Sequence, residues 1–138
     1  MTVGELARRT GMSRKAIREL ERLGLIYSAG RNEANYRLFD DSALWCVNVI
    51  RDLRSLGLTI KEIQQLAAIY LDRPDEPIGP HLAALVERAD ARIEDRLSGL
   101  LALRARIARF RRDNAAALAG SSDVELTVGD PRRSAMGP

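Results

Sequence analysis

The sequence predicts a mainly α-helical protein, in which a winged helix-turn-helix domain is followed by one long helix that pairs in a homodimer. The first reason is a short turn, TGMS, between two amphipathic segments. The second is a stretch with two β-capable pieces, LIYSAGRNEANYRLF, directly after them. The third is a long segment, residues 81–118, with no proline and with apolar residues mostly three or four positions apart.

The two helices of the helix-turn-helix are predicted by their end residues. Thr2 and Glu5 have capping-box spacing, which favours a helix over residues 2–9. Ser13 is a favourable N-cap for a helix over residues 14–23, and Gly24 is a favourable residue to end it.

A hairpin and two further helices complete the predicted N-terminal domain. Leu25–Tyr27 and Tyr36–Phe39 are expected to form the two strands of a wing. Aspartates at its end predict a helix over residues 41–56, and a Thr-x-x-Glu capping box opens a fourth helix from Thr59 to Tyr70. We therefore expect a winged helix-turn-helix domain over residues 1–71.

The second half of the chain is predicted to be a hinge, a long helix and a tail. DRPDEPIGP, residues 72–80, contains three prolines and so cannot continue a helix. A helix over residues 81–118 is roughly 55 Å long and needs a partner for its apolar stripe, so we expect a coiled coil in a homodimer. Folding back on the N-terminal domain is the less favoured alternative. Residues 119–138 are predicted to be a flexible tail. The predicted dimerisation residues are Leu82, Val86, Ala89, Ile93, Leu97, Leu100 and Ile107.

Composition narrows the classes of function. The chain has one cysteine and one histidine, so neither an internal disulfide nor a cysteine-rich metal site is expected, and no catalytic triad is available. No phosphate-binding glycine loop occurs. No signal peptide or membrane-spanning run is evident, which favours a cytoplasmic protein. Residues 1–39 carry eight Lys/Arg against four Asp/Glu, an excess of +4 that is compatible with a nucleic-acid partner.

The segment SRKAIRELERLG divides into a basic and an apolar face. On a helix, Arg14, Lys15, Arg18 and Arg22 lie within about 100° of one another, whereas Ala16, Ile17, Leu20 and Leu23 lie on the other side. A helix that enters the major groove of double-stranded DNA needs this division. The role of Glu19 stays open: it is placed to pair with Lys15 or to accept from a cytosine amino group.

The combination of motifs resembles the MerR family of bacterial transcription regulators. The motifs are VGELARRTGMS, AIRELERLGLI, YRLF followed by acids, and IRDLRSLGLTIKEI, and the resemblance covers residues 2 to about 112. It implies a homodimer whose long helices pair antiparallel and whose winged domains bind a pseudo-palindromic operator. It also implies action at promoters, where such regulators bend and untwist the DNA for RNA polymerase.

By position, the resemblance assigns DNA contacts to Arg18 and, in the wing, to Arg31, Tyr36 and Arg37. The chain departs from the family pattern in two places. Glu19 and Leu20 stand where the family usually has two tyrosines, and Asn35 stands where glycine is common. Helical phase predicts that Leu20 lies in the core.

The resemblance also suggests what is sensed. Members that detect metals or redox state use cysteines at both ends of the long helix, and this chain has none there. We expect Cys46 to be a buried structural thiol, and no cofactor. Two alternatives stay open: a small apolar effector near the dimer interface, with Trp45, Tyr70 and Phe110 as candidate walls, or no effector at all. Core packing is the favoured role of these aromatics.

Two other functions are compatible with the sequence. One is an architectural, excisionase-like DNA-bending protein. The other is a protein-interaction module that has kept the fold and lost operator binding.

Overall fold

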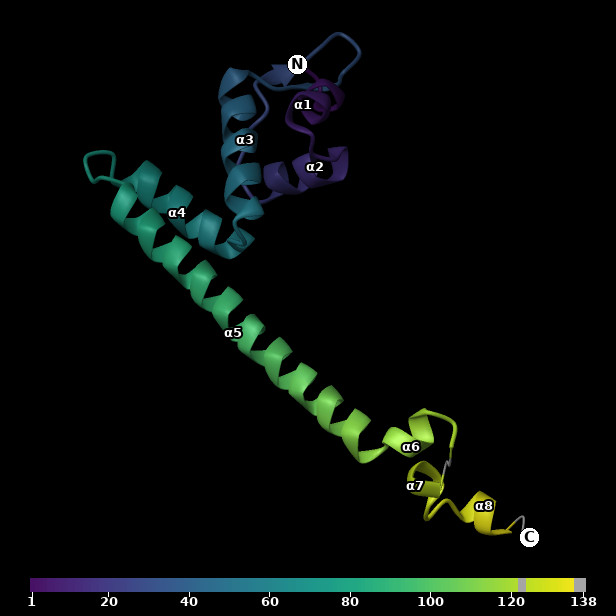
Figure 1. Cartoon of the computed structure of the whole chain (residues 1–138). Helices are drawn as coiled ribbons and strands as arrows, with labels where there is room; N and C mark the ends of the chain where they lie inside the picture. The colour runs from purple at the N-terminus through teal and green to yellow at the C-terminus, as the bar shows by residue number, and fades with distance from the viewer. Residues whose placement is uncertain (122–123, 136–138) are drawn as a thin grey trace. The chain divides into compact units, whose positions relative to one another are not determined.

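The computed structural model describes residues 1–121 and 124–135, and the chain is mainly helical (Figure 1). It divides into two compact units, Met1–Ala91 and Arg92–Pro138. The elements, in chain order, are α1 (Val3–Thr10), α2 (Arg14–Arg22), β1 (Gly30–Arg31), β2 (Arg37–Leu38), α3 (Asp41–Ser55), α4 (Ile60–Asp72), α5 (Gly79–Asp113), α6 (Ala115–Leu118), α7 (Val124–Thr127) and α8 (Pro131–Ala135).

The first four helices begin at the predicted caps. The side chains of Thr2, Ser13, Asp40 and Thr59 each accept a hydrogen bond from the backbone N–H three residues further on. At α4 the capping box is complete, because the backbone N–H of Thr59 also donates to Oε1 of Glu62 at 2.9 Å. Each cap satisfies an N–H group that has no partner within its helix, so the side chains fix where these helices start.

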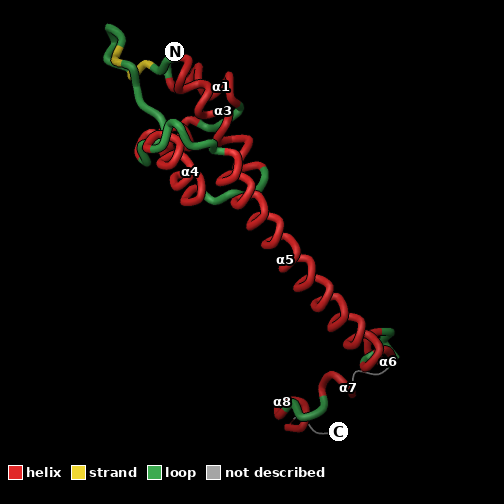
Figure 2. The backbone as a smooth tube through the Cα atoms, turned by 90° about the vertical axis from the view of Figure 1, so that its left-hand side faces the viewer, coloured by secondary structure: helices red, strands yellow, loops and turns green. Residues whose placement is uncertain are grey.

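The wing is a two-stranded antiparallel hairpin (Figure 2). Gly30 pairs with Leu38 and Arg31 with Arg37. The predicted first strand, Leu25–Tyr27, is wrong: Ile26 is buried in the core, and the backbone N–H of Leu25 donates to the carbonyl of Leu20 at the end of α2. That segment therefore closes the helix and adds to the core, and the first strand begins at Gly30, five residues after its predicted start.

The core of the first unit combines α1 to α4 with the start of α5. Its buried members are Leu6, Ile17, Leu20, Ile26, Phe39, Ala43, Val47, Ile50, Leu58, Ile63, Leu66, Leu85 and Ala89. Leu85 and Ala89 lie four residues apart, and therefore on one face of α5. The first compact unit accordingly extends past the predicted boundary at residue 71.

This packing changes the assignment of two predicted dimerisation residues. Ala89 is buried in the core of its own chain, and Leu82 packs partly buried against the same core. The fold-back alternative is thus correct for the first turns of α5. The physical reason is that the apolar face of these turns completes a core that four short helices leave open.

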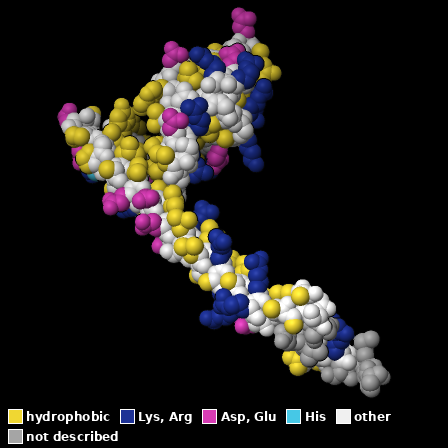
Figure 3. Space-filling model, viewed as in Figure 1, with side chains coloured by type: hydrophobic (Ala, Val, Ile, Leu, Met, Phe, Trp, Pro, Cys, Tyr) yellow, Lys and Arg dark blue, Asp and Glu magenta, His cyan; other side chains and the backbone are white. Residues whose placement is uncertain are grey.

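Two aromatic side chains of the first unit lie on its surface. Trp45 on α3 is 57 % exposed and Tyr70 on α4 is 55 % exposed, so the prediction that they pack in the core is wrong. Figure 3 shows hydrophobic side chains gathered over α3 and α4. Cys46 is partly buried, and this burial, together with the charge of Asp40, raises the pKa of its thiol.

The long helix ends earlier than the sequence predicts. It stops at Asp113 rather than at residue 118: the backbone of Asn114 leaves the helical conformation, with φ −124° and ψ 26°, and the side-chain amide of Asn114 donates to the carbonyl of Phe110. The predicted flexible tail contains two short helices, α7 and α8. Residues 122–123 and 136–138 of that tail lie outside the described residues. In the described part of the chain, no helix is long and apolar enough to cross a membrane.

Because Leu85 is buried in the first unit, shortening its side chain should destabilise the fold strongly. Leu85→Ala should lower the free energy of unfolding by about 2–5 kcal/mol, because it removes a buried side chain and leaves a cavity. Leu71→Ala is the control, since Leu71 is 67 % exposed on α4. Urea denaturation measures both variants. Equal small effects would show that the start of α5 does not belong to this core.

Candidate nucleic-acid interface

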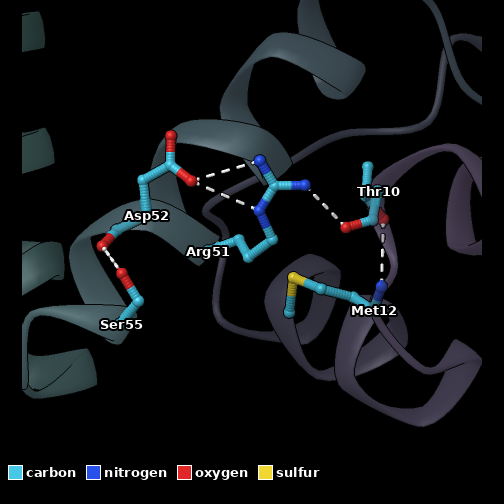
Figure 4. A network of polar contacts seen from close by, with 5 residues as sticks. All are labelled: Thr10, Met12, Arg51, Asp52 and Ser55. Carbon is cyan, nitrogen blue, oxygen red and sulfur yellow. Dashed lines mark hydrogen bonds and ion pairs between the residues drawn. The ribbon is translucent and has the colours of Figure 1, made fainter.

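The turn between α1 and α2 is held by Thr10 and by a side chain from α3 (Figure 4). The buried hydroxyl of Thr10 donates to the carbonyl of Leu6 at 2.8 Å and accepts from the backbone N–H of Met12 at 3.4 Å. Nη1 of Arg51 donates to the carbonyl of Thr10 at 2.8 Å, while Asp52 accepts from its Nε and Nη2. Arg51 thus joins α3 to the turn that orients α2.

Helix α2 has the two faces that its sequence predicts. Ile17 is fully buried and Leu20 is 3 % exposed, so both belong to the core. The predicted DNA-contacting residues of the helix are all exposed: Arg14, Lys15, Arg18 and Arg22. Burial of one face therefore turns the basic face toward solvent, and Figure 3 shows Lys and Arg side chains gathered along one side of the first unit.

The side chain of Arg14 lies against α1 at Gly4. A Cβ atom on Gly4 would come within 2.7 Å of Nη2 of Arg14 and within 3.1 Å of its Cζ. Both distances are shorter than van der Waals contact, so only glycine leaves room for the guanidinium in this position. Gly4 therefore permits this position of the guanidinium, and a side chain at residue 4 would displace the flexible end of Arg14.

A hollow separates the second half of α2 from the wing. Its volume is about 490 Å³. Its lining residues are Arg18, Glu21, Arg22, Ser28, Arg31 and Arg37. Four of the seven predicted DNA-contacting residues thus share one concave surface, although they come from α2, β1 and β2.

Two carboxylates of α2 bind two of these arginines. Glu19 accepts from Nε of Arg22 at 2.8 Å and from its Nη2 at 2.5 Å, and these contacts lower the pKa of the Glu19 carboxyl. Its hydrogen-bond partner is therefore Arg22, while the charge of Lys15 also contributes to lowering the pKa of Glu19. Glu21 accepts from Nη1 of Arg37, which lies in β2.

The tip of the wing is shaped by hydrogen bonds within the loop. Asn35 has φ +66°, a left-handed conformation that asparagine tolerates better than most residues. Oδ1 of Asn32 accepts from the backbone N–H of Tyr36, and Nη1 of Arg31 donates to the carbonyl of Asn35, both at 3.0 Å. Tyr36 itself is 66 % exposed, so its ring is available to a ligand.

Sequence reasoning missed the roles of Arg51 and Glu21. Arg51 is one of several charged residues on α3, and its bond to Thr10 joins positions 41 residues apart. Glu21 and Arg37 are 16 residues apart and lie in different elements. Neither contact follows from helical spacing, so no local pattern indicates it.

Metal ligands are sparse in the described residues. Among them, no group of three or more His, Cys, Asp and Glu side chains is placed to hold an ion. Nε2 of His81 contacts Oε1 of Glu76 at 3.1 Å, and Arg73 contacts the other oxygen of Glu76. These two contacts lower the pKa of Glu76.

Comparison with known proteins confirms the resemblance. Residues 1–68 match the family model described as MerR HTH family regulatory protein, and residues 45–110 match the one described as MerR, DNA binding. The HTH-type transcriptional regulator HmrR of Sinorhizobium medicae is 34 % identical over 100 residues, which are 69 % of this chain and 68 % of that protein. Across the first curated relatives, the match spans between 50 % and 68 % of the relative's length.

Two solved structures are similar to this one. The transcription regulator PbrR691 of Ralstonia metallidurans, crystallised in complex with lead(II), has a TM-score of 0.68 and 32 % identity over 82 % of this chain and 86 % of that chain. HiNmlR, a MerR family regulator lacking the sensor domain and bound to promoter DNA, has a TM-score of 0.58 over 96 % of this chain and 97 % of that chain. At 20 % identity, the second likeness supports the fold alone. Together with the family matches, these likenesses establish that the chain belongs to the MerR family of helix-turn-helix regulatory proteins.

Proposed function

We propose that the protein is a sequence-specific DNA-binding transcription regulator that acts as a homodimer on a pseudo-palindromic promoter operator. The observation that carries this proposal is the arginine-lined hollow between α2 and the wing. Clustered guanidinium groups on a concave, exposed surface fit the phosphates and guanine edges of double-stranded DNA. Membership of the MerR family supports the same conclusion.

Each element of the first unit has a part in this function. Helix α2 enters the major groove of the DNA. Arg18, at the centre of its exposed face, contacts a base edge or a DNA phosphate. Wing residues contact flanking phosphates, which fix the register of the domain on the duplex. The DNA-contacting set is Arg14, Lys15, Arg18, Arg22, Arg31, Tyr36 and Arg37.

The second part of the proposal is a homodimer formed by α5. From Val86 onward, this helix has a row of large apolar side chains that are 40–58 % exposed. The row comprises Val86, Ile93, Leu97, Leu100 and Ile107, with Leu103 and Phe110 beside it. A helix with such a stripe is stabilised by a partner helix, and a second copy in antiparallel coiled-coil pairing supplies it.

The regulator acts on promoters in the cytoplasm, by bending and untwisting the DNA between promoter elements so that RNA polymerase engages both. Phosphate contacts from two arginine-lined hollows offset the cost of deforming the duplex. Similarity to the transcriptional regulator HmrR, at 34 % identity, supports a promoter as the target.

The regulator responds either to a small apolar effector near the dimer interface or to no effector. An open hollow of about 500 Å³ lies at the end of α5, where Leu103, Ile107 and Phe110 are accompanied by Arg106, Arg109, Asp113 and Asn114. Lead binding by PbrR691 is not extended to this chain, because a site for a soft metal is built from several thiolates and Cys46 is the one cysteine of these 138 residues.

The proposal is tested by selecting duplexes from a random library with the full-length protein. We expect a recovered sequence with two-fold symmetry, bound in gel shifts and protected as two half-sites in footprints. Binding that shows no sequence preference at low salt, from a protein that is folded and dimeric, would contradict it.

Arg18→Ala should weaken binding to the selected duplex by about 1–3 kcal/mol, because it removes the central cation of the exposed face of α2. Lys61→Ala removes an exposed charge from α4 and should leave the affinity unchanged. Fluorescence anisotropy titrations measure both. Wild-type affinity of Arg18→Ala would mean that this face of α2 does not meet the DNA.

Leu97→Glu should convert the dimer to a monomer, because it places a charge in the apolar stripe of α5. Ser98→Glu adds the same charge one position along and should stay dimeric. Light scattering reports the mass against 15.3 kDa per chain. A wild-type monomer, or a Leu97→Glu dimer as stable as wild type, would refute the assigned interface.

A further inference from the structure

Two carboxylates stand two residues apart in α2, and each holds an arginine of the DNA-facing surface. Glu19 pairs with Arg22 in the same helix, three residues on, and the side chains are 50 % and 68 % exposed. Glu21 pairs with Arg37 of β2, and its own side chain is only 16 % exposed. The first pair stays within one helix, whereas the second joins the helix to the wing.

The wing needs such an attachment. Its sheet consists of two strands of two residues each, and an isolated two-stranded hairpin is only marginally stable in water. The buried side chain of Phe39 and its backbone N–H bond to the carbonyl of Met1 hold the base of the hairpin. Further out, Arg37 reaches α2 through Glu21.

Electrostatic attraction to DNA does not explain why a carboxylate, Glu21, lies on this surface. A carboxylate beside the phosphate-binding surface repels DNA, so removal of either glutamate should strengthen binding if only charge mattered. A guanidinium has five N–H donors, so Arg37 keeps donors for a phosphate while Nη1 is bound to Glu21. If Glu21 increases the affinity for DNA, it must do so by fixing the position of the Arg37 side chain.

We propose that Glu21 is a positioning residue for DNA binding: it fixes the wing against α2 through Arg37, so that the arginines of both elements meet the duplex as one rigid surface. Glu19 has no such role, because an exposed pair within one helix contributes little and leaves the wing unaffected. This inference rests on the proposed DNA-binding function.

Opposite responses of two matched variants test the proposal. Glu21→Ala should weaken binding to the duplex selected by the wild-type protein by about fivefold, the scale of one coupled contact. Glu19→Ala removes the same charge two residues away and should bind equally or more tightly. Glu21→Gln loses the same charge as Glu21→Ala but keeps an acceptor for Arg37, so it should bind more tightly than Glu21→Ala.

A double-mutant cycle identifies the partner. In an Arg37→Ala background, Glu21→Ala should cause no further weakening, because the contact is already lost. Thermal denaturation is the control for folding: the melting temperatures of Glu19→Ala and Glu21→Ala should agree closely. Glu21→Ala binding as tightly as wild type, or losing the same affinity without Arg37, overturns the positioning role.

Failure of the proposal is distinguishable from failure of the function on which it rests. If the wild-type protein selects no duplex, the DNA-binding function is refuted. If the wild-type protein binds its selected duplex and both glutamate variants bind more tightly, the function stands and the positioning role of Glu21 is refuted.

Discussion

Burial of Ile17 and Leu20 against the core is the interaction on which the rest of the interface depends. These two side chains fix the rotation of α2 about its axis, and that rotation alone decides which residues face solvent. The helix is only nine residues long, so it has little stability of its own. Its cap at Ser13 sets its start, and the bond from Arg51 to Thr10 sets the turn before it.

The charged surface is organised by acids as well as by bases. Four arginines around one hollow repel one another, and Glu19 and Glu21 each neutralise one of them. The two acids bind partners in different elements. Glu19 contacts Arg22 in the same helix, whereas Glu21 contacts Arg37 in a hairpin that has few backbone hydrogen bonds. Glu19 therefore adds a negative charge within the helix, whereas the contact between the helix and the wing is made by Glu21.

Local chemistry explains which parts of this architecture follow from sequence. Capping residues predict the helix starts because the cap and its N–H donor are three residues apart, and the faces of α2 follow from helical phase. Contacts between distant residues do not follow. Ile26 has a β-branched side chain, which is typical of strands, but it is buried in the core outside any strand. The apolar stripe of α5 is regular along its length, so the sequence does not indicate that its first turns pack on their own chain. Exposure of Trp45 and Tyr70 depends on tertiary packing for the same reason.

The central claim is that the exposed basic face of α2 lies against DNA. The sequence contains two lysines, Lys15 on that face and Lys61 on α4, and both are exposed. Acetylation followed by mass spectrometry, with and without a saturating selected duplex, compares them within one molecule. We predict that DNA protects Lys15 and leaves the reactivity of Lys61 unchanged. Equal reactivity of Lys15 in the free and bound protein would contradict the account.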